Sequence, residues 1–131
     1  MKEDLEKLRE RSRLISDKAR TEAVAKRHGT GSRTARENLD DLIAEVQRTP
    51  SFFDEIDEGS LVEYGRFAVA AQRGRREMQD LIEKTPADGI IGGTARINGE
   101  FFDDETAACA VLSYDYTVMA GTQGAVGHLK K

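Results

Sequence analysis

The first part of the chain carries a thin apolar stripe on an otherwise polar background. Its apolar positions follow one another at spacings of three, seven and four, which is typical of one face of a helix. We therefore predict a polar helix over residues 3–27, ended by the glycine-containing segment 28–32. A stripe this narrow does not hold a helix in place by itself, so we expect it to lean on a partner surface. The stripe consists of Leu5, Leu8, Ile15 and Ala19.

The clearest local signal is a capping box at the start of a second helix. Thr34 is followed three residues later by Glu37. In this pattern the hydroxyl and the carboxylate each accept a hydrogen bond from an otherwise unpaired backbone N–H. Thr49 and Pro50 should end the helix, because the residue before proline disfavours the α region. Its predicted apolar face consists of Leu39, Leu42, Ile43 and Val46, and an acidic connection with Phe52, Phe53 and Ile56 follows.

The middle of the chain predicts a short strand and a third helix. Residues 61–64 form a strand candidate between two glycines. The third helix is expected over residues 69–84, and Thr85 with Pro86 should end it. The apolar positions of this helix are Met78, Leu81 and Ile82, and its solvated side carries Arg73, Arg75 and Arg76.

The pattern then changes from helical to strand-like. Residues 90–97 and 107–118 are predicted strands, and the dipeptide Asn98-Gly99 between them favours a hairpin turn because both positions tolerate positive φ. The fold class is therefore α+β or α/β, with N-terminal helices followed by a β-hairpin. Because the chain reaches Lys131 without a closing element, we expect residues 1–131 to be a single incomplete domain.

Composition removes several classes of protein. One cysteine excludes a disulfide framework and a Cys-rich zinc site, and two histidines far apart disfavour a His-based metal centre. The longest apolar run, residues 107–112, is too short to span a bilayer, and the charged first twenty residues lack a secretory signal. A cytoplasmic protein without a membrane association is the expectation.

Charge is divided unevenly along the chain, whose net charge is −4. Residues 1–36 hold 11 basic against 6 acidic side chains, whereas residues 37–131 hold 9 against 18. A basic arm before an acidic body can bind nucleic acid. However, this arm has no aromatic residue for base stacking, and its acidic residues dilute the cations. We therefore expect no nucleic-acid partner.

The residues alone assemble no complete active site. Cys109 is predicted to be a buried core thiol that nothing brings to His128, and Ser113 lacks a nucleophile elbow. The acidic residues 103–105 lack calcium-loop spacing and are expected to be a solvated hairpin tip. The glycine-rich residues 120–127 match neither a Walker loop nor GxGxxG, so they predict a tight turn into a helix whose N-terminus could favour an anion.

Four motifs together resemble the N-terminal portion of biotin-dependent acyl-CoA carboxyltransferases, that is, propionyl-CoA and acetyl-CoA carboxylase β subunits or fused long-chain acyl-CoA carboxylases. The first is a "TARE" helix start at residues 34–37, and the second is a glycine-led turn at residues 59–63. The third is the "PADG" segment that leads into a strand at residues 86–92, and the fourth is the "DYTV" segment that runs to Gly124. Their order over roughly three quarters of the chain carries the resemblance.

This resemblance implies a crotonase-like fold of repeated ββα units, with residues 1–58 as a helical arm and scaffold and residues 59–131 as the start of the core. It implies that carboxybiotin on a separate carrier delivers CO2 to the α-carbon of an acyl-CoA. The partners would be the acyl-CoA, the remaining carboxyltransferase domain, biotin carboxylase and the biotin carrier, in an oligomer. The residues it places in the acyl-CoA pocket are Thr117, Val118, Gly121, Thr122 and Gly124.

The sequence also departs from the family's pattern. Residues 44–57 form an apparent insertion, the hairpin loop of residues 100–106 is longer than usual, and the oxyanion-forming glycine turns of the family lie beyond the equivalent of Lys131. We therefore expect the isolated chain to be an inactive segment, with no catalytic residue of its own. The alternative hypothesis is a small non-catalytic protein-interaction module, motivated by the uneven charge.

Overall fold

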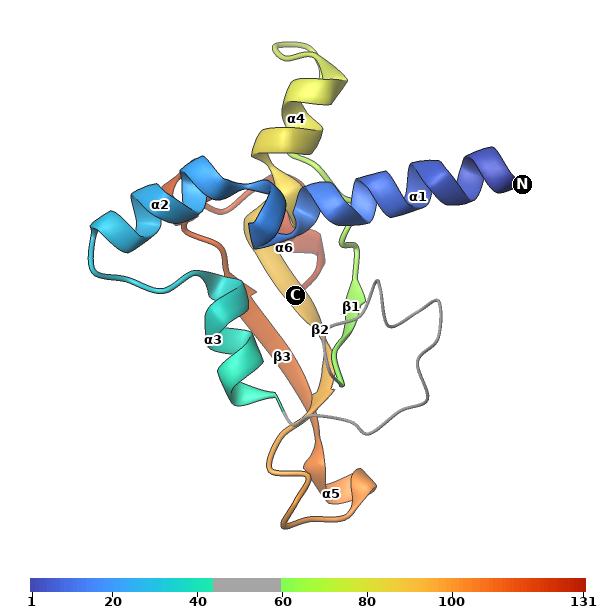
Figure 1. Ribbon diagram of the computed structural model, residues 1–131, viewed down its shortest axis with the longest axis vertical. Helices are drawn as coiled ribbons and strands as arrows, with labels where there is room; N and C mark the ends of the chain where they lie inside the picture. The colour runs from blue at the N-terminus through green and yellow to red at the C-terminus, as the bar shows by residue number, and fades with distance from the viewer. Residues whose placement is uncertain (44–59) are drawn as a thin grey trace.

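The computed structural model describes residues 1–43 and 60–131. Three helices cross one end of an antiparallel sheet or lie against it (Figure 1). The helices are α1 (Lys2–Ile15), α2 (Thr21–Gly29) and α3 (Ala35–Leu42), and the strands, in the order β1-β2-β3, are β1 (Val62–Tyr64), β2 (Ile90–Arg96) and β3 (Ala108–Tyr114). The mixed helical and strand class predicted from the sequence is confirmed.

Short helices and turns fill the connections. Three are α-helical: α4 (Met78–Lys84), α5 (Asp104–Ala107) and α6 (Ala125–Leu129). Three are 3-10 turns: η1 (Asp17–Ala19), η3 (Pro86–Gly89) and η4 (Met119–Gly121). Among the helices of the described ranges, none combines the length and the apolar character needed to cross a bilayer.

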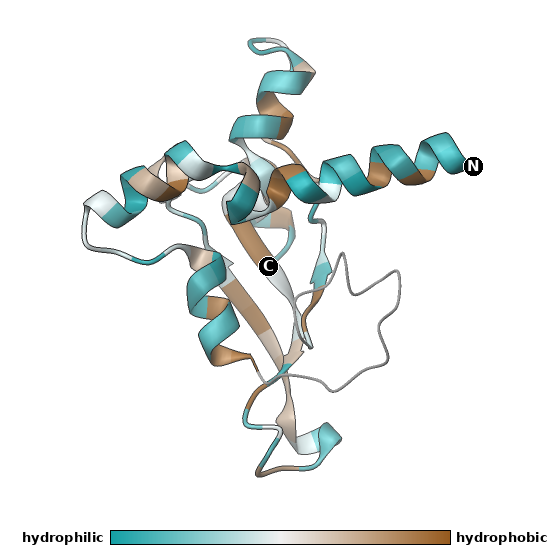
Figure 2. Cartoon of the chain, in the orientation of Figure 1, coloured by the Kyte–Doolittle hydropathy of each residue, from teal (hydrophilic) through white to brown (hydrophobic). Residues whose placement is uncertain are grey.

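The core lies between α3 and one face of the sheet. Leu39 and Ile43 of the α3 segment bury their side chains there, and Figure 2 shows the brown apolar strands behind a mostly teal helical arm. The predicted capping box is confirmed, since Thr34 Oγ1 accepts from the Glu37 N–H at 3.1 Å and Glu37 Oε2 accepts from the Thr34 N–H at 2.7 Å. The core cluster comprises Ala35, Leu39, Ile43, Leu61, Ile91, Ala95 and Val111.

A buried ion pair sits in this same layer. Arg36 of α3 donates two hydrogen bonds to the Glu63 carboxylate of β1, at 3.0 and 3.1 Å. The two side chains are only 6% and 3% exposed. By joining α3 to β1, the pair links the "TARE" helix to the strand that follows the glycine-led turn. Gly93 of β2 lies opposite Glu63, and β1 is so close that a Cβ on Gly93 would lie 2.2 Å from the Val62 carbonyl oxygen, so this position requires glycine.

The opposite face of the sheet keeps apolar side chains in contact with solvent. Val62 is 52% exposed, Tyr64 48% and Leu112 55%. Tyr64 pairs with Gly92, which pairs with Leu112, so these side chains share one face. Exposed apolar surface of this kind is typical of a site that contacts another protein surface.

The predicted helix over residues 3–27 is wrong as a single element. Ser16 adopts an extended conformation after α1, and its hydroxyl donates to the Arg13 carbonyl at 2.7 Å. The 3-10 turn η1 follows, and α2 starts after Arg20. Of the predicted apolar stripe, Leu5 and Ile15 lie on α1, where Ile15 is buried and Leu5 is 40% exposed, whereas Ala19 lies in η1 beyond the break. Tertiary contacts of the junction, described below, override the local helical pattern.

The other helix boundaries also differ from the prediction. The α3 helix ends at Leu42, which is 49% exposed, while Val46, Phe52, Phe53, Ile56 and the Thr49-Pro50 stop lie outside the described residues. The third helix covers only Met78–Lys84, because the Ala70 N–H donates to the Thr85 hydroxyl and draws residues 69–77 into turns. Of the predicted apolar positions, Leu81 is fully buried, Ile82 is half-buried and Met78 is 38% exposed. The arginines at 73, 75 and 76 are exposed, as predicted.

The hairpin is confirmed, but its turn and its ends differ. Asn98 has the left-handed φ of 56°, whereas Gly99 does not, and the connection continues through α5 until the Ala107 carbonyl accepts from the Ile97 N–H. The returning strand ends at Tyr114 and not at Val118, because the Asp115 carbonyl accepts from the Val118 N–H and its carboxylate accepts from the Thr117 N–H, which together close a turn. Cys109 is half-buried, so its prediction as a buried core thiol is wrong.

Candidate functional site

The predicted acyl-CoA residues all lie in the turn that follows β3, between residues 115 and 124. The turn packs against the loop of η3 and leads into α6. Val118 is 2% exposed, and its side chain fills the space beside Gly89, whose φ is +76°. Thr122 is exposed, whereas Thr117, Gly121 and Gly124 are half-buried. The structure thus brings the five predicted residues to one turn with different degrees of access.

The first part of the turn is held by a buried carboxylate. Asp115 Oδ1 accepts from the Thr117 N–H at 2.9 Å and from the Thr117 hydroxyl at 2.5 Å. Arg20 Nη1 donates to Thr117 Oγ1 at 2.8 Å and lies 3.4 Å from Asp115 Oδ2. The Arg20 and Asp115 side chains are 7% and 10% exposed. Sequence reasoning missed Arg20, because nothing in its neighbourhood marks a residue that pairs 95 positions later.

The glycines of the turn make close contacts within the protein. A Cβ on Gly121 would lie 2.8 Å from the ring of Tyr116, and Gly121 has a φ of +76°. A Cβ on Gly124 would lie 2.2 Å from Asp88 Oδ2. Both positions therefore require glycine for internal packing. These internal contacts account for both glycines without a ligand.

Asp88 caps the helix that the glycine turn leads into. Its buried carboxylate accepts from the Gly127 N–H at 2.7 Å, and its backbone is left-handed, with a φ of 48°. Lys130 Nζ donates to the carbonyls of Ala87 and Ile90, and burial lowers the pKa of this lysine. The chain's own carboxylate therefore occupies the N-terminus of α6, where the sequence left room for an external anion.

Two grooves flank the turn, and Thr117 lines both. The larger, of about 650 Å³, runs between α2 and α4, and its charged lining residues are the cations Arg20, Lys26, Arg76 and Lys84 and the carboxylates Glu22 and Glu83. The smaller, of about 330 Å³, runs between the start of α3 and the end of β3. Arg27 covers the ring of Tyr116 at 5.0 Å along this second groove. Cationic and aromatic groups beside a glycine turn suit an anionic ligand with a flat ring system.

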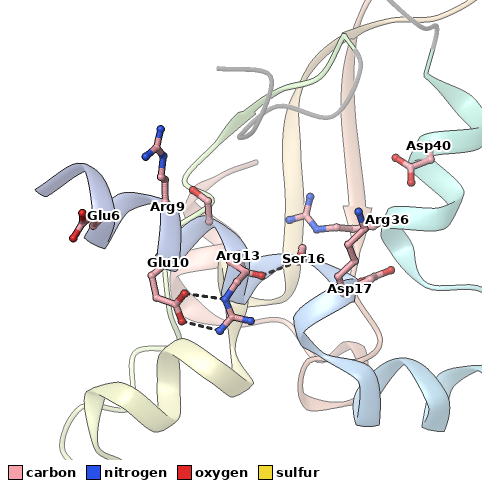
Figure 3. A pocket seen from close by; sticks show the side chains of 10 residues that line it. Glu6, Arg9, Glu10, Arg13, Ser16, Asp17, Arg36 and Asp40 are labelled. Carbon is pink, nitrogen blue, oxygen red and sulfur yellow. Dashed lines mark hydrogen bonds and ion pairs between the residues drawn. The ribbon is translucent and has the colours of Figure 1, made fainter. Parts of the chain in front are cut away.

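A third groove, of about 620 Å³, is lined by residues of α1, η1 and α3 (Figure 3). Arg13 makes a two-pronged ion pair with Glu10 there, and this arginine lowers the pKa of the glutamate. Its lining mixes both signs of charge, with Arg36 and Asp40 on the far wall. Apart from Arg36 of the "TARE" segment, this groove contains none of the residues singled out from the sequence.

The remaining candidates are not brought together. Cys109 lies opposite Ala95 within the hairpin, whereas His128 is exposed on α6. Asp103 caps α5 by accepting from the Thr106 N–H at 2.7 Å, so the acidic hairpin tip has a structural role. Within residues 1–43 and 60–131, no cluster of three or more His, Cys, Asp or Glu side chains has the geometry of a metal site.

The chain is similar in sequence to propionyl-CoA carboxylase beta chains. The chain is 34% identical over 125 residues to a propionyl-CoA carboxylase beta chain from Roseobacter denitrificans, and 33% identical over 104 residues to one from Saccharopolyspora erythraea. These alignments take in 93% and 79% of this chain but only 19% and 15% of the relatives. The chain therefore spans less than a fifth of the length of the curated relatives it matches. No protein-family model matches the sequence.

Solved structures agree with the sequence relatives. A single-chain, multi-domain long-chain acyl-CoA carboxylase is similar over 97% of this chain and 11% of its own, with 49% identity and a TM-score of 0.83. Transcarboxylase 12S, whose hexamer was solved with hydrolysed methylmalonyl-coenzyme A, is similar over 95% of this chain, with 26% identity and a TM-score of 0.64. The resemblance predicted from the four motifs is confirmed. In sequence and in fold, this chain corresponds to a segment of acyl-CoA carboxylase chains.

Proposed function

We propose that this chain is the N-terminal segment of a carboxyltransferase that moves a carboxyl group from carboxybiotin to the α-carbon of an acyl-CoA. The observation that carries the proposal is the 49% identity and 0.83 TM-score over 97% of the chain to a long-chain acyl-CoA carboxylase. Residues 1–58 would form the arm and scaffold, and residues 59–131 the start of a crotonase-like core. The proposed partners within an oligomer are the rest of the carboxyltransferase domain, biotin carboxylase and the biotin carrier.

The proposed role of the turn after β3 is to line the acyl-CoA pocket with Thr117, Val118, Gly121, Thr122 and Gly124. The buried side chain of Val118 would support the wall, whereas the exposed Thr122 would face the ligand. Of the cations in the adjoining groove, Lys26 would suit a phosphate of coenzyme A, whereas Arg76 and Lys84 already pair with Asp80 at 3.7 and 2.5 Å.

Biotin supplies a transferable carboxyl group when its carrier presents it. The backbone donors described at this turn do not fit that group, because the N–H groups of Thr117 and Gly127 already donate to the carboxylates of Asp115 and Asp88. We therefore assign the acyl-CoA to this segment and no contact with biotin.

A chimera tests the proposal. This chain would replace the corresponding segment of the long-chain acyl-CoA carboxylase, and activity would be measured as incorporation of labelled bicarbonate into acyl-CoAs of increasing chain length. We expect acyl-CoA-dependent carboxylation, because both sequence and fold match over nearly the whole segment. An inactive chimera that assembles to the size of the parent enzyme would contradict the proposed function.

A pair of tryptophan variants locates the pocket within the active chimera. Thr122→Trp adds bulk at an exposed position, so we expect a KM for acyl-CoA about tenfold higher with an unchanged melting temperature. Thr106→Trp makes the same change at an exposed position of α5 and should leave the KM unchanged. Equal KM values for the two variants would remove Thr122 from the pocket.

A further inference from the structure

The break between α1 and α2 holds two side chains that reach distant elements. Asp17 Oδ2 accepts from the Thr34 hydroxyl at 2.5 Å, which joins the break to the N-cap of α3. Arg20, three residues later, is the residue from which α2 starts, and it reaches the turn after β3. The junction thus fixes the helical arm to two parts of the molecule at once.

The contact from Arg20 neutralises a carboxylate that the turn depends on. Asp115 is 7% exposed, and its two oxygens have different partners. Oδ1 accepts from the Thr117 N–H, whereas Oδ2 faces the Arg20 guanidinium. A buried carboxylate without a cation is strongly unfavourable. Without Arg20, Asp115 would take up a proton or turn outward to water, and either change alters the hydrogen bonds that define residues 115–117.

A second arginine contacts the same turn. Arg27 lies on α2, seven residues after Arg20, which is the N-cap residue of that helix. Its guanidinium covers the Tyr116 ring at 5.0 Å and is oriented by a 3.0 Å hydrogen bond from its Nε to the Arg33 carbonyl. Tyr116 in turn packs on Gly121. The α2 helix and its N-cap residue together contact three consecutive residues of the turn, from Asp115 to Thr117.

We propose that Arg20 is a positioning residue for the acyl-CoA pocket. It acts through Asp115 and Thr117, and it holds the turn that carries the pocket residues in the conformation that accepts the ligand. The inference rests on the proposed function, since it assumes that this turn lines the pocket. The helical arm thereby serves the pocket directly, in addition to its role as scaffold.

The test uses the active chimera with three arginine variants. Arg20→Met removes the charge but keeps the length of the side chain, and we expect the KM for acyl-CoA to rise about tenfold or more. Arg20→Lys keeps a cation that can reach one of the two acceptors, so it should recover part of the loss. Arg75→Met makes the matched change at an exposed arginine and should leave the KM unchanged. A KM for Arg20→Met within twofold of the parent value would overturn the inference.

A double variant separates positioning from stability. In Arg20→Met with Asp115→Asn the buried charge is gone, so we expect the melting temperature to return toward the parent value. The KM should stay high, because the cation that bridges Asp115 and Thr117 is still missing. Recovery of both quantities together would mean that Arg20 only stabilises the fold, and would overturn the inference.

Amide hydrogen exchange on the 131-residue chain tests the positioning role of Arg20 independently of catalysis. Arg20→Met should accelerate exchange at the Thr117 and Gly121 amides by about tenfold or more, and Arg75→Met should not. Unchanged exchange at these amides would overturn the inference even if the chimera were inactive. If the parent chimera were inactive but Arg20→Met accelerated exchange at these amides, the proposed function would be contradicted. The role of Arg20 in holding the turn would still be supported.

Discussion

The buried ion pair between Arg36 and Glu63 makes the sharpest prediction about stability. Its two side chains are 6% and 3% exposed, and both hydrogen bonds have good lengths. Arg36→Met leaves the Glu63 carboxylate in the core layer without its bidentate partner. Removing one member of such a pair costs about 3–5 kcal/mol, because the other charge stays buried.

This cost is large against the total stability of the chain. A domain of this size is stable by roughly 5–15 kcal/mol, and each kcal/mol shifts the midpoint by about 3–5 °C. We therefore expect Arg36→Met to lower the melting temperature of the 131-residue chain by about 10–20 °C, followed by far-UV circular dichroism. Arg36→Met with Glu63→Leu should recover most of this loss, because apolar residues of similar volume replace the pair without an unmatched charge.

The control is an ion pair of the same chemistry in solvent. Arg33 and Asp41 lie 3.1 Å apart with side chains that are 52% and 72% exposed. Asp41→Asn should change the free energy of unfolding by less than about 1 kcal/mol. A loss of under 1 kcal/mol for Arg36→Met, or a double variant no more stable than the single one, would refute the argument from burial.

Three further predictions follow from local geometry. Gly93→Ala should cost about 3 kcal/mol or more in a urea titration, because its Cβ would meet the Val62 carbonyl oxygen at 2.2 Å, whereas Gly74→Ala, with nothing within 4 Å, should be near neutral. Gly124→Ala should destabilise the chain because its Cβ would lie 2.2 Å from Asp88 Oδ2, and Asp88→Ala with Gly124→Ala should recover part of the loss; full additivity would contradict this contact. The His28 hydrogen bond, followed by that of the Thr34 N–H, lowers the pKa of Glu37 below its usual 4.5. The unfolded chain therefore binds the proton first, and stability that is present above pH 4.5 should fall as the pH drops through the lowered pKa. Glu37→Gln should lose this acid-dependent part in melts between pH 5 and 3, and an identical pH profile would argue against it.

Local signals in the sequence predicted the features that depend on near neighbours. The capping box at Thr34 and Glu37 needs only three residues, and the structure has it. The two strands of the hairpin follow from the Val, Leu, Ile and Tyr residues on either side of Asn98-Gly99. The four motifs also predicted the similarity to acyl-CoA carboxylases, which the comparisons confirm. They located the turn after β3, although its role as a pocket remains a prediction.

Contacts between distant residues decided what the sequence left open or indicated wrongly. A helical pattern continues through residues 16–20, but the chain breaks there because Asp17 pairs with Thr34 and Arg20 with Asp115 and Thr117. Likewise, the Thr85 hydroxyl takes the Ala70 N–H and shortens the third helix. The use of Asp88 to cap α6 joins residues 39 positions apart. Local propensities are worth a few tenths of a kcal/mol per residue, whereas a buried charge or N–H without a partner costs several times more, so tertiary pairing prevails.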